Sequence, residues 1–139
     1  MSDKVWARHS NPWSGWTRVL SIPVLAIGLF LHSWWIMGAI AVWIIVNPML
    51  FSPPKSINNW MSKGVLGEKL YTQGGKFLKK DLPTLLNLLN GAAFFFFLWY
   101  GWSQDLYLMI ATGLLHMTFK FWYLDRMVVL YERHLEKRP

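Results

Sequence analysis

The sequence predicts an all-α integral membrane protein, a four-helix bundle of two helical hairpins with both termini in the cytoplasm. Two observations lead to this fold class. Val19–Phe51 contains no Asp, Glu, Lys or Arg, and Leu82–Phe119 contains a single charged residue, Asp105. Because a helix needs about 20 apolar residues to cross the hydrocarbon core of a bilayer, each stretch suits two crossings better than one. The distribution of the basic residues, described below, gives the orientation.

The composition agrees with a membrane setting. The chain of 139 residues is 54% hydrophobic, 17% aromatic and only 15% charged, whereas soluble domains carry about 25% charged residues. It contains no Cys, which excludes a disulfide framework, a thiolate metal site and a Cys nucleophile. A net charge of +7 would suggest nucleic acid as the partner of a soluble protein. In a membrane protein, a positive net charge more often reflects how the chain is oriented across the membrane. We therefore expect no nucleic-acid partner.

Polar residues near the middle of each apolar stretch, at His32-Ser33 and at 103–105, divide it into two helices. The predicted helices span about residues 17–31, 34–51, 83–102 and 106–131. A cytoplasmic loop at 52–81 joins the two hairpins. Within that loop, apolar residues at irregular helical spacing predict a short helix on the membrane surface over 57–70. The alternative is that 19–51 forms one long kinked helix, which would leave three crossings.

The positions of the basic residues favour four crossings. All 14 Lys and Arg lie before the first predicted helix, in the central loop, or from the end of the last helix onward, and the short turns contain none. Four crossings place these regions on one side, and the side enriched in Lys and Arg is the cytoplasmic one. The prediction is a multi-pass protein of the inner (plasma) membrane. Its basic loop is expected to attract anionic lipid headgroups.

Polar residues inside the predicted spans are the first candidates for function, because polar groups are costly in a bilayer. With a rise of about 1.5 Å per residue, antiparallel packing of the last two helices places Asn90 level with His116 and Asn87 level with Lys120. Asn47 lies at a similar depth. The predicted polar intramembrane cleft consists of Asn47, Asn87, Asn90, His116 and Lys120. The alternative is simple hydrogen bonding between helices, with the Lys120 ammonium reaching the headgroups.

A second group of polar residues lies at the predicted cytoplasmic border: Arg8, His9, Arg18, Glu68, Asp125 and Arg126. Neighbours on a helix do not face each other, so Asp125 and Arg126 are expected to pair elsewhere, with Arg8 or Arg18 and with Glu68. His9 and His134 are expected to be exposed and to titrate near neutral pH. These residues either form ion pairs at the membrane border or build an acid–base or phosphate-handling site.

His116 is also a candidate axial ligand, because it lies deep in the predicted bundle near aromatic residues and imidazole is a common metal ligand. A haem or pigment is therefore one candidate cofactor, although no cofactor is identified. His32, at the outer turn, is expected to be solvated. No cluster of His, Asp or Glu has the spacing of a metal site within the membrane, so none is predicted.

Four stretches carry a family resemblance: RHSNPWS at 8–14, NPMLF at 47–51, WMSKGVLGE at 60–68 and DRM at 125–127. On these stretches the chain resembles a family of small prokaryotic integral membrane proteins of unknown function. The resemblance implies no activity, cofactor or catalytic residue. In the predicted topology, all four stretches lie at the cytoplasmic border.

The same stretches have structural interpretations. Ser10 or Asn11 followed by Pro12 predicts the start of a short helix. The Asn47-Pro48 pair predicts the end of the second long helix. Gly64 and Gly67 predict a tight turn and a close approach of two backbones.

Three functions fit these observations; the sequence favours the first, an accessory or structural subunit, and the other two are alternatives. The first is a non-catalytic accessory subunit of a larger membrane complex, suggested by small size, the all-round aromatic surface at Phe94–Phe97 and the lack of a reaction motif. The second is a membrane enzyme acting on a lipid or quinone-like substrate, with His116 as acid–base group and Lys120 or Arg126 holding an anion. The third is a haem- or pigment-binding protein. Membrane lipids and other membrane subunits are the expected partners.

Overall fold

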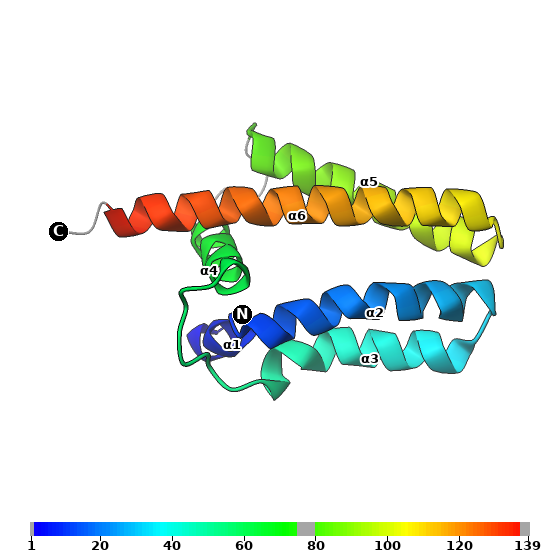
Figure 1. Ribbon diagram of the computed structural model, residues 1–139, viewed down its shortest axis with the longest axis horizontal. Helices are drawn as coiled ribbons and strands as arrows, with labels where there is room; N and C mark the ends of the chain where they lie inside the picture. The colour runs from blue at the N-terminus through cyan, green and yellow to red at the C-terminus, as the bar shows by residue number, and fades with distance from the viewer. Residues whose placement is uncertain (1, 75–79, 137–139) are drawn as a thin grey trace.

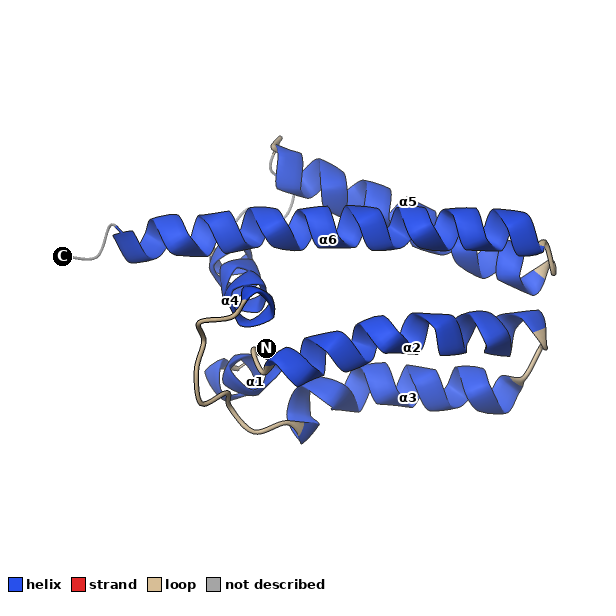
Figure 2. Ribbon diagram, viewed as in Figure 1, coloured by secondary structure: helices blue, strands red, loops and turns tan. Residues whose placement is uncertain are grey.

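The computed structural model describes residues 2–74 and 80–136, and all regular structure in these ranges is helical (Figures 1 and 2). The helices are α1 (Asp3–His9), α2 (Pro12–Phe30), α3 (Trp34–Leu50), α4 (Trp60–Gln73), α5 (Leu82–Trp102) and α6 (Leu106–Glu136). The basic residues Lys76, Lys79, Lys137 and Arg138, which contribute to the predicted orientation, lie outside the described residues.

The four long helices form two antiparallel hairpins that lie side by side, α2 with α3 and α5 with α6 (Figure 1). Both hairpin turns lie at one end of the molecule, while α1, α4 and the C-terminal end of α6 lie at the other. The chain reverses between Phe30 and Trp34, so the alternative of one kinked helix over 19–51 is wrong. The short helix expected over 57–70 is present as α4, with its bounds shifted to 60–73.

Local signals explain most helix boundaries. The Asn11 side chain accepts a hydrogen bond from the Trp13 amide and Pro12 occupies the first turn, which starts α2 earlier than residue 17. Asn59 caps α4 through the Ser62 amide. The prediction that Asn47-Pro48 ends the second long helix is wrong, because α3 continues through Pro48 to Leu50.

Hydrogen bonds between the two turns join the hairpins at one end. His32 Nε2 lies 2.8 Å from the Trp102 carbonyl oxygen, and Gln104 Nε2 donates to the Phe30 carbonyl oxygen at 2.9 Å. Both residues have positive φ angles, 48° for His32 and 59° for Gln104, as required by tight reversals after a helix. His32 is therefore not simply solvated as expected, since it connects the first turn to the end of α5.

Two clusters of buried apolar side chains stabilise the arrangement. One lies between the hairpins and contains Leu25, Leu29, Phe97 and Met109. The other holds α4 against α5 and α6 and contains Met61, Leu86, Tyr123, Leu124 and Met127. Gly67 faces the Met127 backbone with no room for a side chain, so the predicted close approach occurs, but within α4 and not in a tight turn.

Candidate polar cleft between the hairpins

A cavity of about 300 Å³ lies where α2, α4, α5 and α6 meet. Most of its lining is apolar, contributed by residues such as Val19, Met61 and Phe94. The polar residues that line it are Arg18, Glu68, Asn90, His116 and Lys120. We call this cavity the inter-hairpin cleft. It combines an apolar wall with a small number of converging polar groups, which is the usual composition of a small-molecule site.

His116 and Asn90 meet inside this cleft. His116 Nδ1 lies 3.3 Å from the Asn90 backbone oxygen, and the His116 ring centroid lies 4.8 Å from that of Phe94. A carbonyl oxygen can only accept a hydrogen bond, so Nδ1 carries the proton and Nε2 of the neutral ring is an acceptor. The Asn90 side-chain oxygen is buried without a hydrogen-bond partner. The cleft therefore contains acceptors that a ligand can satisfy.

Two cations lie on the walls of the cleft. Arg18 Nε donates to the Ser14 carbonyl oxygen at 3.2 Å, and Lys120 Nζ lies 5.3 Å from the centroid of the Tyr123 ring. Among the described residues, neither cation forms an ion pair, and neither does Glu68. Two positive side chains and one carboxylate thus share a largely apolar cavity, where charges interact more strongly than in water.

His9 of α1 is buried near the two cations. Its side chain is 5% exposed, and Nδ1 has no hydrogen-bond partner. Burial, together with the charges of Arg18 and Lys120, lowers the pKa of His9 from 6.5 to about 3. The expectation that His9 is exposed and titrates near neutral pH is therefore wrong, because α1 folds back against α2, α3 and α4.

Two residues of the predicted cleft lie elsewhere. Asn47 is fully buried between α2 and α3, where its side-chain oxygen accepts from Ser14 Oγ at 2.7 Å and its amide donates to Thr17 Oγ1 at 2.9 Å. Asn87 is exposed on α5 and does not line the cavity. The prediction that Asn47 and Asn87 line the cleft is wrong, because residues at similar depth along their helices can point their side chains in different directions.

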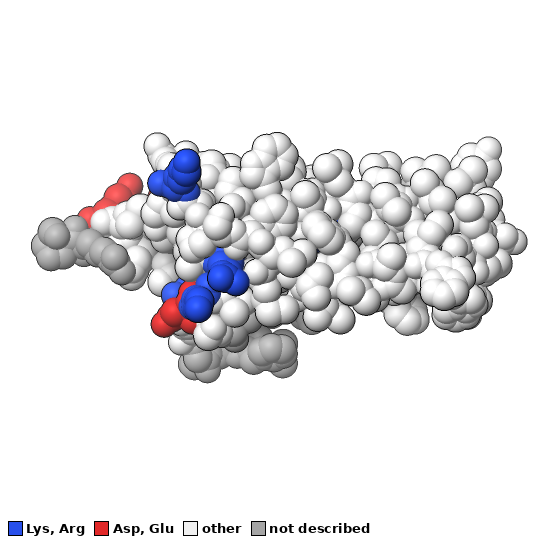
Figure 3. All heavy atoms as spheres, turned by 90° about the horizontal axis from the view of Figure 1, so that it is seen from below, with Lys and Arg blue, Asp and Glu red and all other residues white. Residues whose placement is uncertain are grey.

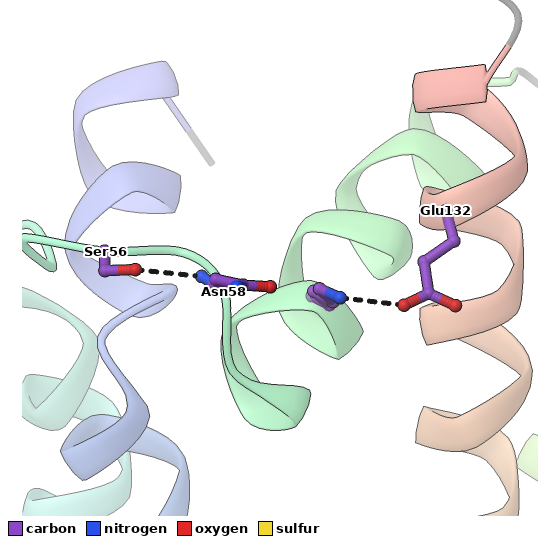
Figure 4. Close-up of polar contacts among 4 residues, drawn as sticks. Ser56, Asn58 and Glu132 are labelled. Carbon is purple, nitrogen blue, oxygen red and sulfur yellow. Dashed lines mark hydrogen bonds and ion pairs between the residues drawn. The ribbon is translucent and has the colours of Figure 1, made fainter.

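The border residues also differ from expectation. Arg126 Nη2 binds the carboxylate of its neighbour Asp125 at 2.6 Å, so the expected partners Arg8, Arg18 and Glu68 are wrong. The long Arg126 side chain bends back far enough to reach its neighbour. Arg8 instead donates to the Met49 carbonyl oxygen at 3.1 Å. Two other ion pairs join α4 to its surroundings, Lys63 to Glu132 at 2.8 Å (Figure 4) and Lys69 to Asp3 at 2.7 Å.

Sequence reasoning missed the partners of the buried polar groups. Ser14 and Thr17 give no signal as isolated hydroxyls, although their spacing of three residues on a helix places them on one face toward Asn47. Gln104 in the second turn indicates only a break between helices in the sequence, although its side chain bonds to the first hairpin. Figure 4 shows a further local bond in the loop before α4, where the Asn58 amide donates to Ser56 Oγ at 3.2 Å.

Within the part of the chain that the structure describes, no group of three or more His, Cys, Asp or Glu is placed to hold a metal ion. By length and composition, two described helices, α2 and α5, could cross a membrane. Fold and site together define an all-α protein with a polar cleft between two helical hairpins. The chain belongs to a family of unknown function, DUF6653, whose family model matches residues 1–137. Neither the curated proteins nor the solved structures include a match to this chain.

Proposed function

We propose that the four long helices cross the inner (plasma) membrane as two hairpins, with both termini in the cytoplasm. Most of the apolar stretch of two of these helices faces outward: 33% of that of α2 and only 17% of that of α5 is buried inside the molecule. Helix α3 is also apolar, though slightly shorter. A core helix of a soluble protein would bury this surface, so the exposed apolar faces favour contact with lipid.

The position of the charges supports the same arrangement. On the face shown in Figure 3, the visible Lys, Arg, Asp and Glu side chains gather at one end of the molecule, and the rest of that face carries none. That end contains α1, α4 and the end of α6 (Figure 1). Because the charged end includes most of the basic residues, the positive-inside rule assigns it to the cytoplasm.

Within this membrane protein, we propose that the inter-hairpin cleft binds an amphipathic molecule, a lipid or a quinone-like compound. The observation that carries the proposal is the convergence of Arg18, Lys120 and His116 on one apolar-walled cavity. An apolar tail fits along the walls, while a negative or carbonyl-bearing head fits the two cations. Unpaired cations in such surroundings are costly, and an anionic or polar head would offset that cost.

Binding is favoured over catalysis by the content of the cleft. Among the described residues that line it, no Ser, Thr or Tyr lies beside His116 to act as a nucleophile with a base. An enzyme that uses His116 as its acid–base group is the second interpretation. Turnover of a lipid or quinone by the wild type that disappears in His116→Ala would favour the enzyme. Binding of such a molecule by the wild type with no turnover would favour the binding protein.

The binding proposal is tested by identifying what purifies with the protein. Wild type, Lys120→Met, Arg18→Met and the control Thr118→Val are purified in mild detergent, and their bound molecules are extracted with organic solvent and identified by mass spectrometry. Thr118 lies on the exposed side of α6, outside the cleft lining. The proposal predicts one amphipathic molecule, close to stoichiometric, in wild type and control, and its loss in the cleft variants. Equal lipid content in all four proteins would contradict it.

A second candidate function is a non-catalytic accessory subunit of a larger membrane complex. It is favoured by the large aromatic side chains that α3 and α5 expose, including Trp35 at 90% and Phe95 at 61%. Lipid could cover these rings, but so could another membrane subunit. Co-purification from native membranes in mild detergent tests this proposal, since a protein that runs only as a monomer would contradict it.

The remaining proposal is that the protein binds haem or a pigment through His116. At about 300 Å³, the cleft lies at the lower end of the usual range for ligand sites, which favours a small ring or headgroup over a large macrocycle. The visible absorption spectrum of protein purified from its native membrane decides the question, because a protein without bands above the Trp region carries neither cofactor.

A further inference from the structure

A second pocket lies near the C-terminal end of α6, and none of its lining residues lines the inter-hairpin cleft. Its volume is about 590 Å³. Its lining residues are Leu70 of α4, Pro83 of α5, and Arg126, Val129, Leu130, Arg133 and His134 of α6. The α6 residues recur at intervals of three and four, so they share one face of the helix. We call this cavity the α6-end pocket.

The polar groups of the α6-end pocket are basic. Arg126, Arg133 and His134 line it, and the other described residues of its lining are apolar, with no carboxylate among them. Arg126 Nη2 is held by Asp125, but Arg126 Nε is buried without a hydrogen-bond partner, and so is His134 Nε2. A buried guanidinium nitrogen always carries a proton and needs an acceptor. The pocket therefore has basic groups whose hydrogen bonding is incomplete.

We propose that the α6-end pocket binds a phosphate group. A phosphate supplies several acceptor oxygens and negative charge, which match two guanidinium groups and an imidazole on one face of α6, with Arg126 about two turns before Arg133 and His134. Leu70, Pro83 and Leu130 give the pocket an apolar side against which the rest of a ligand can lie. The pocket lies at the charged end of the molecule, where both a lipid headgroup and free phosphate could reach it.

The proposal is tested on the full-length protein in mild detergent with two probes. Binding of phosphatidic acid is measured by native mass spectrometry, and binding of inorganic phosphate by phosphorus NMR. The variants are Arg133→Gln, Arg133→Lys and Arg126→Gln, and the control is Lys55→Gln. Arg133 and Lys55 are both exposed, so their replacement leaves the fold intact, and the control removes the same charge outside the pocket. Circular dichroism checks that each variant is folded.

Loss of one charge-assisted hydrogen bond weakens binding by about tenfold or more. We therefore expect about tenfold weaker binding in Arg133→Gln and Arg126→Gln, a smaller loss in Arg133→Lys, and no change in Lys55→Gln. Binding of phosphatidic acid alone identifies a lipid headgroup as the ligand, and binding of inorganic phosphate identifies free phosphate. Failure of wild type to bind either probe, or binding that is equal in the control and both Gln variants, would overturn the proposal.

Discussion

Gly67 in α4 packs directly against the carbonyl group of Met127 in α6, and a methyl group on Gly67 would overlap that oxygen. The partner is backbone in the middle of a long helix, so it cannot move aside as a flexible side chain would. This contact sets how closely α4 approaches α6, and α4 in turn contributes Met61, Val65 and Glu68 to the inter-hairpin cleft. The geometry of the cleft therefore depends on Gly67, which has no side chain to keep α4 away from α6.

Replacing Gly67 with Ala is expected to destabilise the protein by about 3 kcal/mol, at the upper end of the usual cost of overpacking. The matched control is Gly64→Ala in the same helix, because a methyl group there would meet Leu124 at an ordinary distance of 3.5 Å. Ala is a better helix former than Gly, so the control should be neutral or slightly stabilising. Thermal unfolding in mild detergent measures both variants. Equal midpoints for the two variants would contradict the close approach of α4 to α6.

Asn47→Ala is expected to destabilise the first hairpin by about 1–3 kcal/mol, because it leaves the buried hydroxyl of Ser14 without its acceptor. The bond between Ser14 Oγ and Asn47 Oδ1 is 2.7 Å long, and both side chains are fully buried. The control is Asn87→Ala, which removes the same group from an exposed position. Thermal unfolding in detergent again gives the comparison. An equal effect of the two substitutions would show that the buried network contributes no stability.

The buried His9 predicts a pH dependence of stability. Its pKa is about 3 in the folded protein against 6.5 for an unperturbed histidine, so between these values the unfolded chain binds more protons than the folded one. Stability due to His9 is therefore complete above pH 6.5 and falls as the pH decreases toward 3, with a slope of up to about 1.4 kcal/mol per pH unit.

The measurement compares wild type with His9→Leu between pH 7 and about 5, a range in which most carboxylates remain charged. His9→Leu removes the titrating group and keeps an apolar side chain in the buried position. The variant should show a shallower loss of stability on acidification than wild type. Identical slopes in the two proteins would contradict a buried, neutral His9.

The sequence predicts the helices well because hydrophobic length and polar breaks determine them locally. The turns near His32 and Gln104 are short-range features of this kind. The Asn11–Pro12 start signal is also local, but it predicts the start of a separate short helix, whereas it begins α2 itself, five residues before the predicted start at 17. Gly67 likewise predicts a close approach of two backbones, although the sequence does not show that the partner is α6. Such features require no knowledge of what packs against them.

The cleft could be predicted only in part, because it depends on the direction in which side chains point. Counting depth along the helices places Asn90 beside His116, as the structure has it, but it cannot show that Asn47 turns toward Ser14 or that Asn87 faces outward. The contribution of Arg18 and Glu68 to the cleft and the burial of His9 arise from tertiary packing of α1 and α4, for which local pattern holds no signal.

We propose that both hairpins cross the membrane from the same side, and cysteine labelling tests this topology directly. Because the chain has no Cys, single substitutions Lys55→Cys, between α3 and α4, and Ser103→Cys, between α5 and α6, introduce unique labelling sites. These two connecting segments lie at opposite ends of the molecule (Figure 1). A membrane-impermeant maleimide is applied to sealed right-side-out and inside-out vesicles. We expect labelling of Ser103→Cys only from the outside and of Lys55→Cys only from the cytoplasmic side. Labelling of both positions from the same side would contradict it.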